Sequence, residues 1–276
     1  MSEVADGAGV DGSAGTADSA GIAGAAGEGA VPAWCEHGPG AHDGGVLGPA
    51  SAPVAARAWL LIEHPGPWGH SAVETDLPAP LADLAAEADA LGIRVQLIRR
   101  PRPAADAPLP AAGPSGPGEP VVYAAWTGEP RAWGARIGGP VPREKGVDLA
   151  ALAAGSVPAG ATADAVPLYL VCAHARRDRC CGRFGGALAR VLAVRYPGRV
   201  WETTHLGGHK HAANLALLPH GLYYGPADLP AATEAIEAYE RGEVVARRYR
   251  GQAGRNPGQQ QAAHARLLAG GGRGSL

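Results

Sequence analysis

The sequence predicts an α/β fold built from two similar halves, and three observations support this expectation. Short apolar runs of strand length alternate with longer segments whose apolar residues recur at helical spacing. The order β-α-β-β-β-α occurs twice along the chain. When the two halves are laid over each other, the run LLIEH at 60–64 falls on the run LYLVC at 168–172.

The first half opens with an apolar strand over residues 58–63. The segment His64-Pro-Gly-Pro-Trp-Gly69 follows, and its prolines and glycines predict a rigid turn. A helix is expected near residues 81–91, because Gly92 is a residue that readily ends a helix. The other elements expected here are a strand at 93–99, a hairpin at 121–126 and 132–137, and a short helix at 148–154.

The second half repeats this order. Its expected elements are a strand at 166–171, a helix at 182–196, a strand at 199–204, a hairpin at 215–218 and 222–224, a helix from 228 to Gly242, and a last helix from 256 to about 268. Phe184, Leu188 and Leu192 lie on one face of the first helix. We therefore expect two thioredoxin-like halves that form a pseudo-repeat, in which the turn at 64–69 is the counterpart of the loop after residue 171.

Composition divides the chain into three parts. Residues 1–50 form a Gly- and Ala-rich acidic tail that we expect to be disordered, because it buries too little apolar surface to offset the entropy of ordering. Cys35 lies in this tail and is expected to be an unpaired thiol. Residues 51–160 form the N-terminal half, with a proline-rich loop at 101–120, and residues 161–276 form the C-terminal half with the last helix.

Charge and composition exclude some classes of function. The formal net charge is -2, and residues 1–56 hold seven acids but no Lys or Arg, which leaves all 24 basic residues with the other 19 acids. This charge balance does not indicate a nucleic-acid-binding protein. No apolar stretch approaches the roughly 20 residues that span a bilayer, and the N-terminus does not have the pattern of a signal peptide. We expect a cytoplasmic protein that binds neither nucleic acid nor membrane.

Two short motifs carry most of the chemistry. Three of the four cysteines lie in the run Cys172-Ala-His-Ala-Arg-Arg-Asp-Arg-Cys-Cys181, and the motif His205-Leu-Gly-Gly-His209 follows a predicted strand. In a reducing compartment, clustered cysteines more often indicate a metal or redox site than a disulfide framework. The thiols of Cys172 and Cys181 and the imidazoles of His205 and His209 therefore predict a metal site with four ligands.

The spacing within these motifs favours an iron–sulfur cluster over a zinc site. Eight residues separate Cys172 from Cys181, whereas zinc fingers and ribbons usually place such a pair two to four residues apart. Gly207 and Gly208 argue against a helical pair of histidines, and they allow the chain to fold back so that both imidazoles point one way. Two thiolates on one iron and two imidazoles on the other are the ligand set of a [2Fe–2S] centre of Rieske type.

The pattern C-x8-C followed by H-x-G-G-H resembles the thioredoxin-like ferredoxin domain of the sucrase/ferredoxin-like family. The segments LLIEHPGPW at 60–68 and ANLALLPHGLYYG at 213–225 are also similar to that family, and the resemblance covers roughly residues 57–268. It implies that residues 161–276 form a ferredoxin domain with a [2Fe–2S] cluster bound by Cys172, Cys181, His205 and His209. Related sequences can carry a basic residue at the position of Cys180, so the resemblance implies that Cys180 is not a ligand.

Other residues near the motifs are candidates for supporting the cluster. His174 is either a hydrogen-bond donor to a ligand or a plain loop residue, and Asn214 is expected to cap or brace the histidine motif. Arg177 and Asp178 are expected to form an ion pair that braces the loop, with donation toward the cluster sulfurs as the alternative. A basic face, solvated or used to dock an acidic redox partner, is predicted from the arginines at 247, 248, 250 and 255.

The sequence thus predicts an electron carrier with one [2Fe–2S] cluster, rather than a stand-alone enzyme, that exchanges electrons with an unidentified redox partner protein. One alternative is a structural zinc protein with two Cys and two His ligands. The other is a thiol–disulfide oxidoreductase of thioredoxin type that uses Cys172, Cys180 or Cys181, although the chain lacks the usual C-x-x-C pair.

Imidazole ligands predict that electron transfer is coupled to protons. Reduction of a cluster bound by His205 and His209 raises the pKa of their N–H groups, so the reduced form binds protons more tightly. We therefore expect the reduction potential to fall as the pH rises through neutral and alkaline values, by up to about 59 mV per pH unit for one electron. Potentiometric titration at several pH values measures this dependence, and a potential that stays flat across the range would contradict the coupling.

Overall fold

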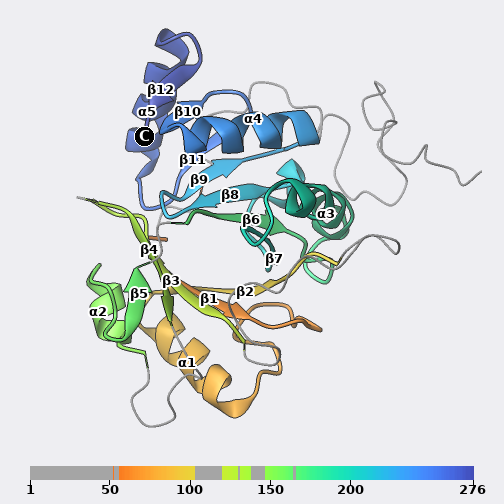
Figure 1. Ribbon diagram of the computed structural model, residues 1–276, viewed down its shortest axis with the longest axis vertical. Coiled ribbons are helices and arrows are strands. Elements are labelled where there is room, and N and C mark those ends of the chain that lie inside the picture. Colours follow the sequence, from red (N-terminus) through yellow and green to blue (C-terminus); the bar gives the residue numbers. More distant parts are fainter. Residues whose placement is uncertain (1–51, 53–55, 103–119, 130, 138–146, 164–165) are drawn as a thin grey trace, which may run out of the picture. The chain divides into compact units, whose positions relative to one another are not determined.

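The computed structural model describes residues 52, 56–102, 120–129, 131–137, 147–163 and 166–276 (Figure 1), which belong to one compact unit, Val31–Leu276. The expected tail at 1–50, with Cys35, and most of the proline-rich loop expected at 101–120 lie outside the described residues. The described part has a mixed α/β structure, as the sequence predicts. None of its helices is long and apolar enough to cross a membrane.

The first half follows the expected order of elements. Strand β1 (Ala58–Glu63) leads into the turn at 64–69, and helix α1 (Ala79–Ala90) ends just before Gly92, whose φ is +72°. The next elements are β2 (Arg94–Arg99), β3 (Val122–Trp126), β4 (Trp133–Ile137), α2 (Leu149–Ala153) and the short strand β5 (Ala161–Ala163).

The second half starts with β6 (Leu168–Cys172), a turn of π-helix over Cys181–Gly185, and helix α3 (Gly186–Arg195). The next elements are β7 (Val200–Thr203), a 3-10 turn over His209–His211, β8 (Leu215–Leu218), β9 (Leu222–Tyr224), α4 (Leu229–Glu240), β10 (Glu243–Val245), β11 (Tyr249–Gln252), α5 (Pro257–Ala269) and β12 (Arg273–Ser275). Helix α4 begins at a capping residue, Asp228, which accepts a hydrogen bond from the backbone N–H of Ala231 at 2.8 Å.

Ten strands form one mixed sheet in the order β11-β9-β8-β6-β7-β2-β1-β3-β4-β5. In each half, the first strand pairs parallel with the second and antiparallel with the third: β1 with β2 and β3, and β6 with β7 and β8. The halves join where β2 and β7 pair antiparallel, with Ile98 opposite Thr203. The short strands β5, β10, β11 and β12 were not predicted, because each contains a polar residue or glycine, whereas the equally short β8 and β9 are continuous apolar runs.

Neighbouring residues on β6 point into two different cores, because side chains alternate between the faces of a strand. Val171 packs in a core with residues of α3 and α4. Leu170 and Cys172 point the other way and pack in a second core that includes Trp59 of β1. Leu60, on the other face of β1, packs with residues of α1 and α2. Figure 1 shows α4 on one side of the sheet strands and α1 on the other. Cys172 therefore belongs to a core that both halves share.

The helix after the cysteine motif begins directly against the end of β6. Gly185 is buried and has a helical φ of -67°. A Cβ atom at this position would lie 1.8 Å from the backbone carbonyl oxygen of Cys172. Glycine is therefore required for space rather than for an unusual φ. This close approach brings Cys181, at the start of the π-helical turn, toward Cys172.

Gly185→Ala is expected to destabilise the fold by about 1–3 kcal/mol or more, because the backbone must move to relieve the overlap with Cys172. Gly186→Ala is the matched control. A Cβ added at Gly186 meets no atom closer than 3.8 Å, so this change should gain up to about 1 kcal/mol of helix propensity. Urea unfolding followed by circular dichroism measures both, and equal stabilities would contradict the close packing at Gly185.

Candidate metal centre

Two parallel strands bring the cysteine and histidine motifs to the same edge of the sheet. β6 and β7 pair in parallel, with Cys172 opposite Thr203. Cys172 is the last residue of β6, and His205 lies two residues beyond the end of β7. The carboxyl ends of parallel strands are where open α/β sheets build their binding sites. The topology therefore places a thiol and an imidazole side by side.

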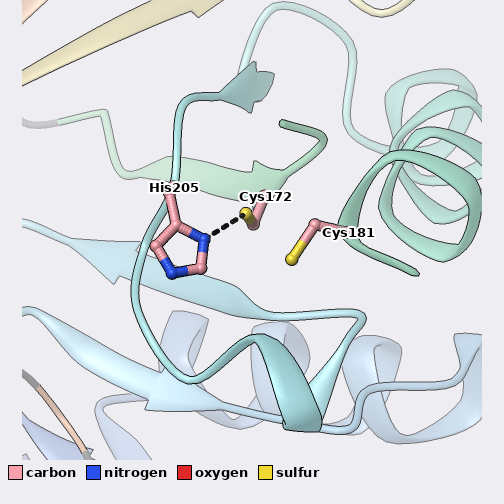
Figure 2. A group of neighbouring side chains, drawn as sticks. All are labelled: Cys172, Cys181 and His205. Atoms are coloured by element: carbon pink, nitrogen blue, oxygen red, sulfur yellow. Dashed lines mark hydrogen bonds between the residues drawn. The ribbon is translucent and has the colours of Figure 1, made fainter. Parts of the chain in front are cut away.

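Three of the predicted ligands converge. The donor atoms of Cys172, Cys181 and His205 all lie within 4.8 Å of one another, and Cys172 Sγ is 3.9 Å from His205 Nδ1. Figure 2 shows Cys172 at the end of its strand, Cys181 at the start of the helix and His205 on the facing loop. Both cysteines are fully buried, and His205 is half-buried. This group of two thiols and one imidazole could hold a metal ion.

The two thiols do not titrate alike. Hydrogen bonds from the Cys181 thiol and from His205 hold the pKa of Cys172 well below its usual range, although burial opposes this shift. The pKa of Cys181 is raised, first by its hydrogen bond to Cys172 and second by burial. Of the two thiols, Cys181 therefore holds its proton more tightly. A metal must displace this proton to bind both sulfurs, so metal binding should release it.

Asp178 positions Cys181 at the beginning of the helix. Its Oδ1 accepts a hydrogen bond from the backbone N–H of Cys181 at 3.1 Å, and its backbone carbonyl accepts from Gly182 N–H at 3.2 Å. These contacts fix the end of the cysteine loop as a helix start. Partial positive charge at a helix N-terminus favours an anionic sulfur. The location of Cys181 therefore supports its use as a thiolate ligand.

His174 connects the turn of the first half to a predicted ligand. Its Nδ1 accepts from the backbone N–H of His205 at 3.2 Å, so its Nε2 carries the proton and donates to the carbonyl of Gly69 at 2.8 Å. The Trp68 ring stands edge-on to the imidazole, with 5.8 Å between centroids. Burial lowers the pKa of His174, which favours the neutral ring that this arrangement requires.

The turn at 64–69 packs against the cysteine loop through these contacts, and a neighbouring contact extends them. Arg177 hydrogen-bonds to His70, just after the turn. Arg177 thus contacts the first half of the chain. Asp178, the partner that we expected for it, accepts a hydrogen bond from the backbone N–H of Cys181. The turn at 64–69 and the residue after it therefore lie against the cysteine loop.

A buried guanidinium and an amide hold the glycines of the histidine motif. Gly207 and Gly208 have φ of +95° and +69°. Asn214 Nδ2 donates to Gly208 O at 3.1 Å, while Arg250 donates to Gly207 O at 3.3 Å and also to Asn214 Oδ1. A Cβ at Gly208 would lie 2.1 Å from a terminal nitrogen of Arg250. Glycine therefore satisfies both the backbone conformation and the close approach of Arg250.

Two residues of the motifs are not among the three converging donors of the described residues. His209 begins the 3-10 turn, and its side chain lies outside what the structure describes, so its role as fourth ligand stays a prediction. Cys180 is buried next to Cys181, but it is not one of the converging donors among the described residues.

A family model described as sucrase/ferredoxin-like matches residues 51–251. The chain belongs to the sucrase/ferredoxin-like family. The match includes both motifs and Arg250, and it confirms the resemblance that the C-x8-C and H-x-G-G-H patterns indicate. Comparisons with curated proteins and with solved structures found no match.

Arg250 is the feature of this sucrase/ferredoxin-like protein that sequence reasoning misjudged. We expected a solvated arginine within the basic run at 247–255, but Arg250 is only 1 % exposed. Burial lowers its pKa to about 10, and nearby Tyr223, Cys172 and Cys181 act in the opposite direction. Its local sequence resembles that of its exposed neighbour Arg247, so no local signal distinguishes it. Its burial depends on packing against a loop more than 40 residues earlier in the chain.

Arg94 is a second residue near the family motif that the sequence did not single out. It lies on β2 of the first half, and its guanidinium donates to the backbone carbonyl of His205 at 3.1 Å. His205 is therefore held by its N–H through His174 and by its carbonyl through Arg94. Both ends of this ligand's peptide backbone are fixed by side chains from other elements.

Arg250→Met is expected to lower the free energy of unfolding by about 1.5–3 kcal/mol, because Gly207 O and Asn214 Oδ1 lose a charged donor. Arg247→Met is the matched control, since its side chain is 50 % exposed and its two ion pairs are at the surface. Surface pairs contribute about 0–1 kcal/mol. Urea unfolding of both variants measures the difference, and equal stabilities would contradict a bracing role for Arg250.

Proposed function

We propose that this protein is an electron carrier with one [2Fe–2S] cluster bound by Cys172, Cys181, His205 and His209. The observation that carries the proposal is the convergence of two buried thiols and one imidazole within 4.8 Å in a member of the sucrase/ferredoxin-like family. The first three ligands come from the described group, and His209 is the fourth by the family pattern. The redox partner is a separate protein.

The donor chemistry fits such a group. Sulfur ligands to iron must be thiolates, and the pKa of Cys172 is already held low by hydrogen bonds to its sulfur. Cys181 lies at a helix N-terminus, where an anionic sulfur is favoured. When bound, the cluster would supply a centre that accepts and returns one electron. Two imidazoles in place of two thiolates make such a centre less negative and raise its reduction potential.

The residues of this chain would supply three further effects. Complete burial of Cys172 and Cys181 excludes water from the sulfur ligands. His174 and Arg94 fix the backbone of His205, which supports the orientation of its ring. Arg250 places a buried positive charge within electrostatic range of both cysteines. Positive charge at this distance favours the more negative, reduced state of the site.

We also infer that the two halves are thioredoxin-like units related by a pseudo-repeat. The shared order β-α-β-β-β-α and the matching strand pairs of β1 and β6 support this inference. In this arrangement the turn at 64–69 is the counterpart of the cysteine loop, without the cysteines. The first half would then support the site, since the carbonyl of its Gly69 accepts a hydrogen bond from His174 of the cysteine loop.

A structural zinc site is the second candidate, and one observation favours it. Donor atoms within 4.8 Å of one another suit ligands around a single tetrahedral ion, whose sulfurs at 2.3 Å from zinc would lie about 3.8 Å apart. The wide spacing of Cys172 and Cys181 in the sequence argues against a zinc knuckle. Thiol–disulfide exchange is disfavoured, because both sulfurs are fully buried and beyond the reach of a protein substrate.

Cys181→Ser is expected to abolish the bound cluster, whereas Cys180→Ser, the matched control one residue earlier, should keep it. Purification without oxygen, followed by iron and sulfide analysis, absorption spectra and EPR of the reduced protein, measures both variants. We expect two irons and two sulfides per chain for a [2Fe–2S] cluster in the unaltered protein and in Cys180→Ser.

His209→Cys tests the fourth ligand, because a third thiolate in place of an imidazole should shift the EPR signal and lower the reduction potential. Protein that is colourless and free of iron when made without oxygen would overturn the proposed cluster. One zinc per chain in its place would establish the second candidate. Equal loss of iron in Cys180→Ser and Cys181→Ser would overturn the choice of ligands.

A further inference from the structure

The loop that carries the cysteine ligands is strongly basic. Between Cys172 and Arg183 it contains four arginines, at positions 176, 177, 179 and 183, and a single acid, Asp178. The chain as a whole has a formal net charge of -2. The positive charge is therefore concentrated beside the candidate site.

Burial separates the two kinds of side chain on this loop. The cysteines at both ends are fully buried, while all four arginines are exposed. Asp178 is half-buried and accepts from the backbone N–H of Cys181, so it points toward the helix start. The solvent-facing side of the loop therefore presents arginines.

Elsewhere in the described residues, several arginines have their charge compensated by acids. On the face formed by α3, α4, β10 and β12, five arginines form ion pairs: Arg195 with Glu237, Arg199 with Glu240, Arg241 with Glu243, Arg247 with Asp228 and Glu234, and Arg273 with Glu234 and Glu243. Within the described residues, neither Arg176 nor Arg179 forms an ion pair. Arg177 contacts a histidine, His70, rather than a carboxylate.

The loop that carries His205 contacts the cysteine loop, because the backbone N–H of His205 donates to His174. His205 is half-buried and is the only one of the three converging ligands that is not fully buried, among the residues that the structure describes. Lys210, on the same loop as His205, is exposed. The least buried of the converging donors in the described residues thus lies on a loop that contacts the arginine-bearing cysteine loop through His174.

We propose that Arg176, Arg177 and Arg179 dock an electron-transfer protein whose contact surface is acidic. This proposal rests on the proposed function, since it supplies the partner for the same site. Opposite charges steer two proteins together and can raise association rates by about 10–1000-fold. A nucleic acid fits less well, because bases bind on exposed aromatic rings and none of the large apolar side chains exposed in the described residues is aromatic.

The experiment measures binding of an acidic flavodoxin to the full chain by calorimetry at low and moderate ionic strength. The double variant Arg176→Glu/Arg179→Glu should weaken binding by at least about tenfold. The matched control Arg195→Glu/Arg241→Glu makes the same change of net charge on the compensated face and should change binding less than about threefold. Arg176→Lys/Arg179→Lys should bind nearly as well as the unaltered protein, because it keeps the charge.

Three outcomes would overturn the docking surface: no binding of flavodoxin to the unaltered protein at low salt, equal weakening by both charge reversals, or tighter binding of a 20-nucleotide RNA than of flavodoxin through the same arginines. Calorimetry detects flavodoxin binding whether or not a cluster is present. Iron and sulfide analysis of each variant therefore distinguishes a failure of the docking surface from a failure of the proposed cluster. Iron-free protein that still binds flavodoxin through these arginines would remove the proposed function and leave the acidic-partner surface standing.

Discussion

The parallel pairing of β6 with β7 is the constraint on which the candidate site depends. This pairing sets Cys172 opposite Thr203, so the loops that leave the two strands start from the same edge of the sheet. An antiparallel pair would send the two motifs to opposite edges. The parallel pair also requires a crossover connection, and helix α3 supplies it. The π-helical turn that leads into α3 begins at Cys181, so one topological requirement places three of the predicted ligands.

Contacts between distant parts of the chain complete the site. The backbone of His205 is held by Arg94, 111 residues earlier, and by His174, which is itself bound to Gly69, 105 residues before it. The contacts of Arg94 with His205 and of His174 with Gly69 each join the first half to a motif loop of the second. Because the halves also share a core that contains Cys172, a second half separated from the first would lose both the packing and the anchoring of its ligands. The first half is therefore part of the site, although it contributes none of the predicted ligands.

Those parts of the site that depend on local chemistry could be predicted from the sequence. Clustered thiols, paired glycines between histidines and apolar strands of five or six residues are all features of neighbouring positions, and they indicated the ligands and the main strands. Arg250 could not be found in this way, because its burial comes from packing under Gly208 rather than from its own segment. The link from His174 to Gly69 was equally hidden, since nothing near either residue specifies the other. The missed strands are short and interrupted by polar residues or glycine, so their pairing depends on their neighbours in the sheet rather than on an apolar run of their own.

Arginines around this site are either buried, as Arg250 is, or exposed, as on the cysteine loop. The groups around each side chain determine its role. Arg250 is surrounded by a carbonyl and an amide oxygen that accept its hydrogen bonds, so its burial is compensated and its effect is to order the glycines of the histidine motif. Arg176 and Arg179 of the cysteine loop are exposed, where holding a long side chain in one position costs entropy and a surface charge gains little stability. A cluster of like charges on a short loop is mildly unfavourable for the fold itself. Its location on a loop that contacts the half-buried predicted ligand His205 is therefore better explained by a charged partner than by stability, whereas the burial of Arg250 is explained by the hydrogen bonds that it donates to the histidine motif and Asn214.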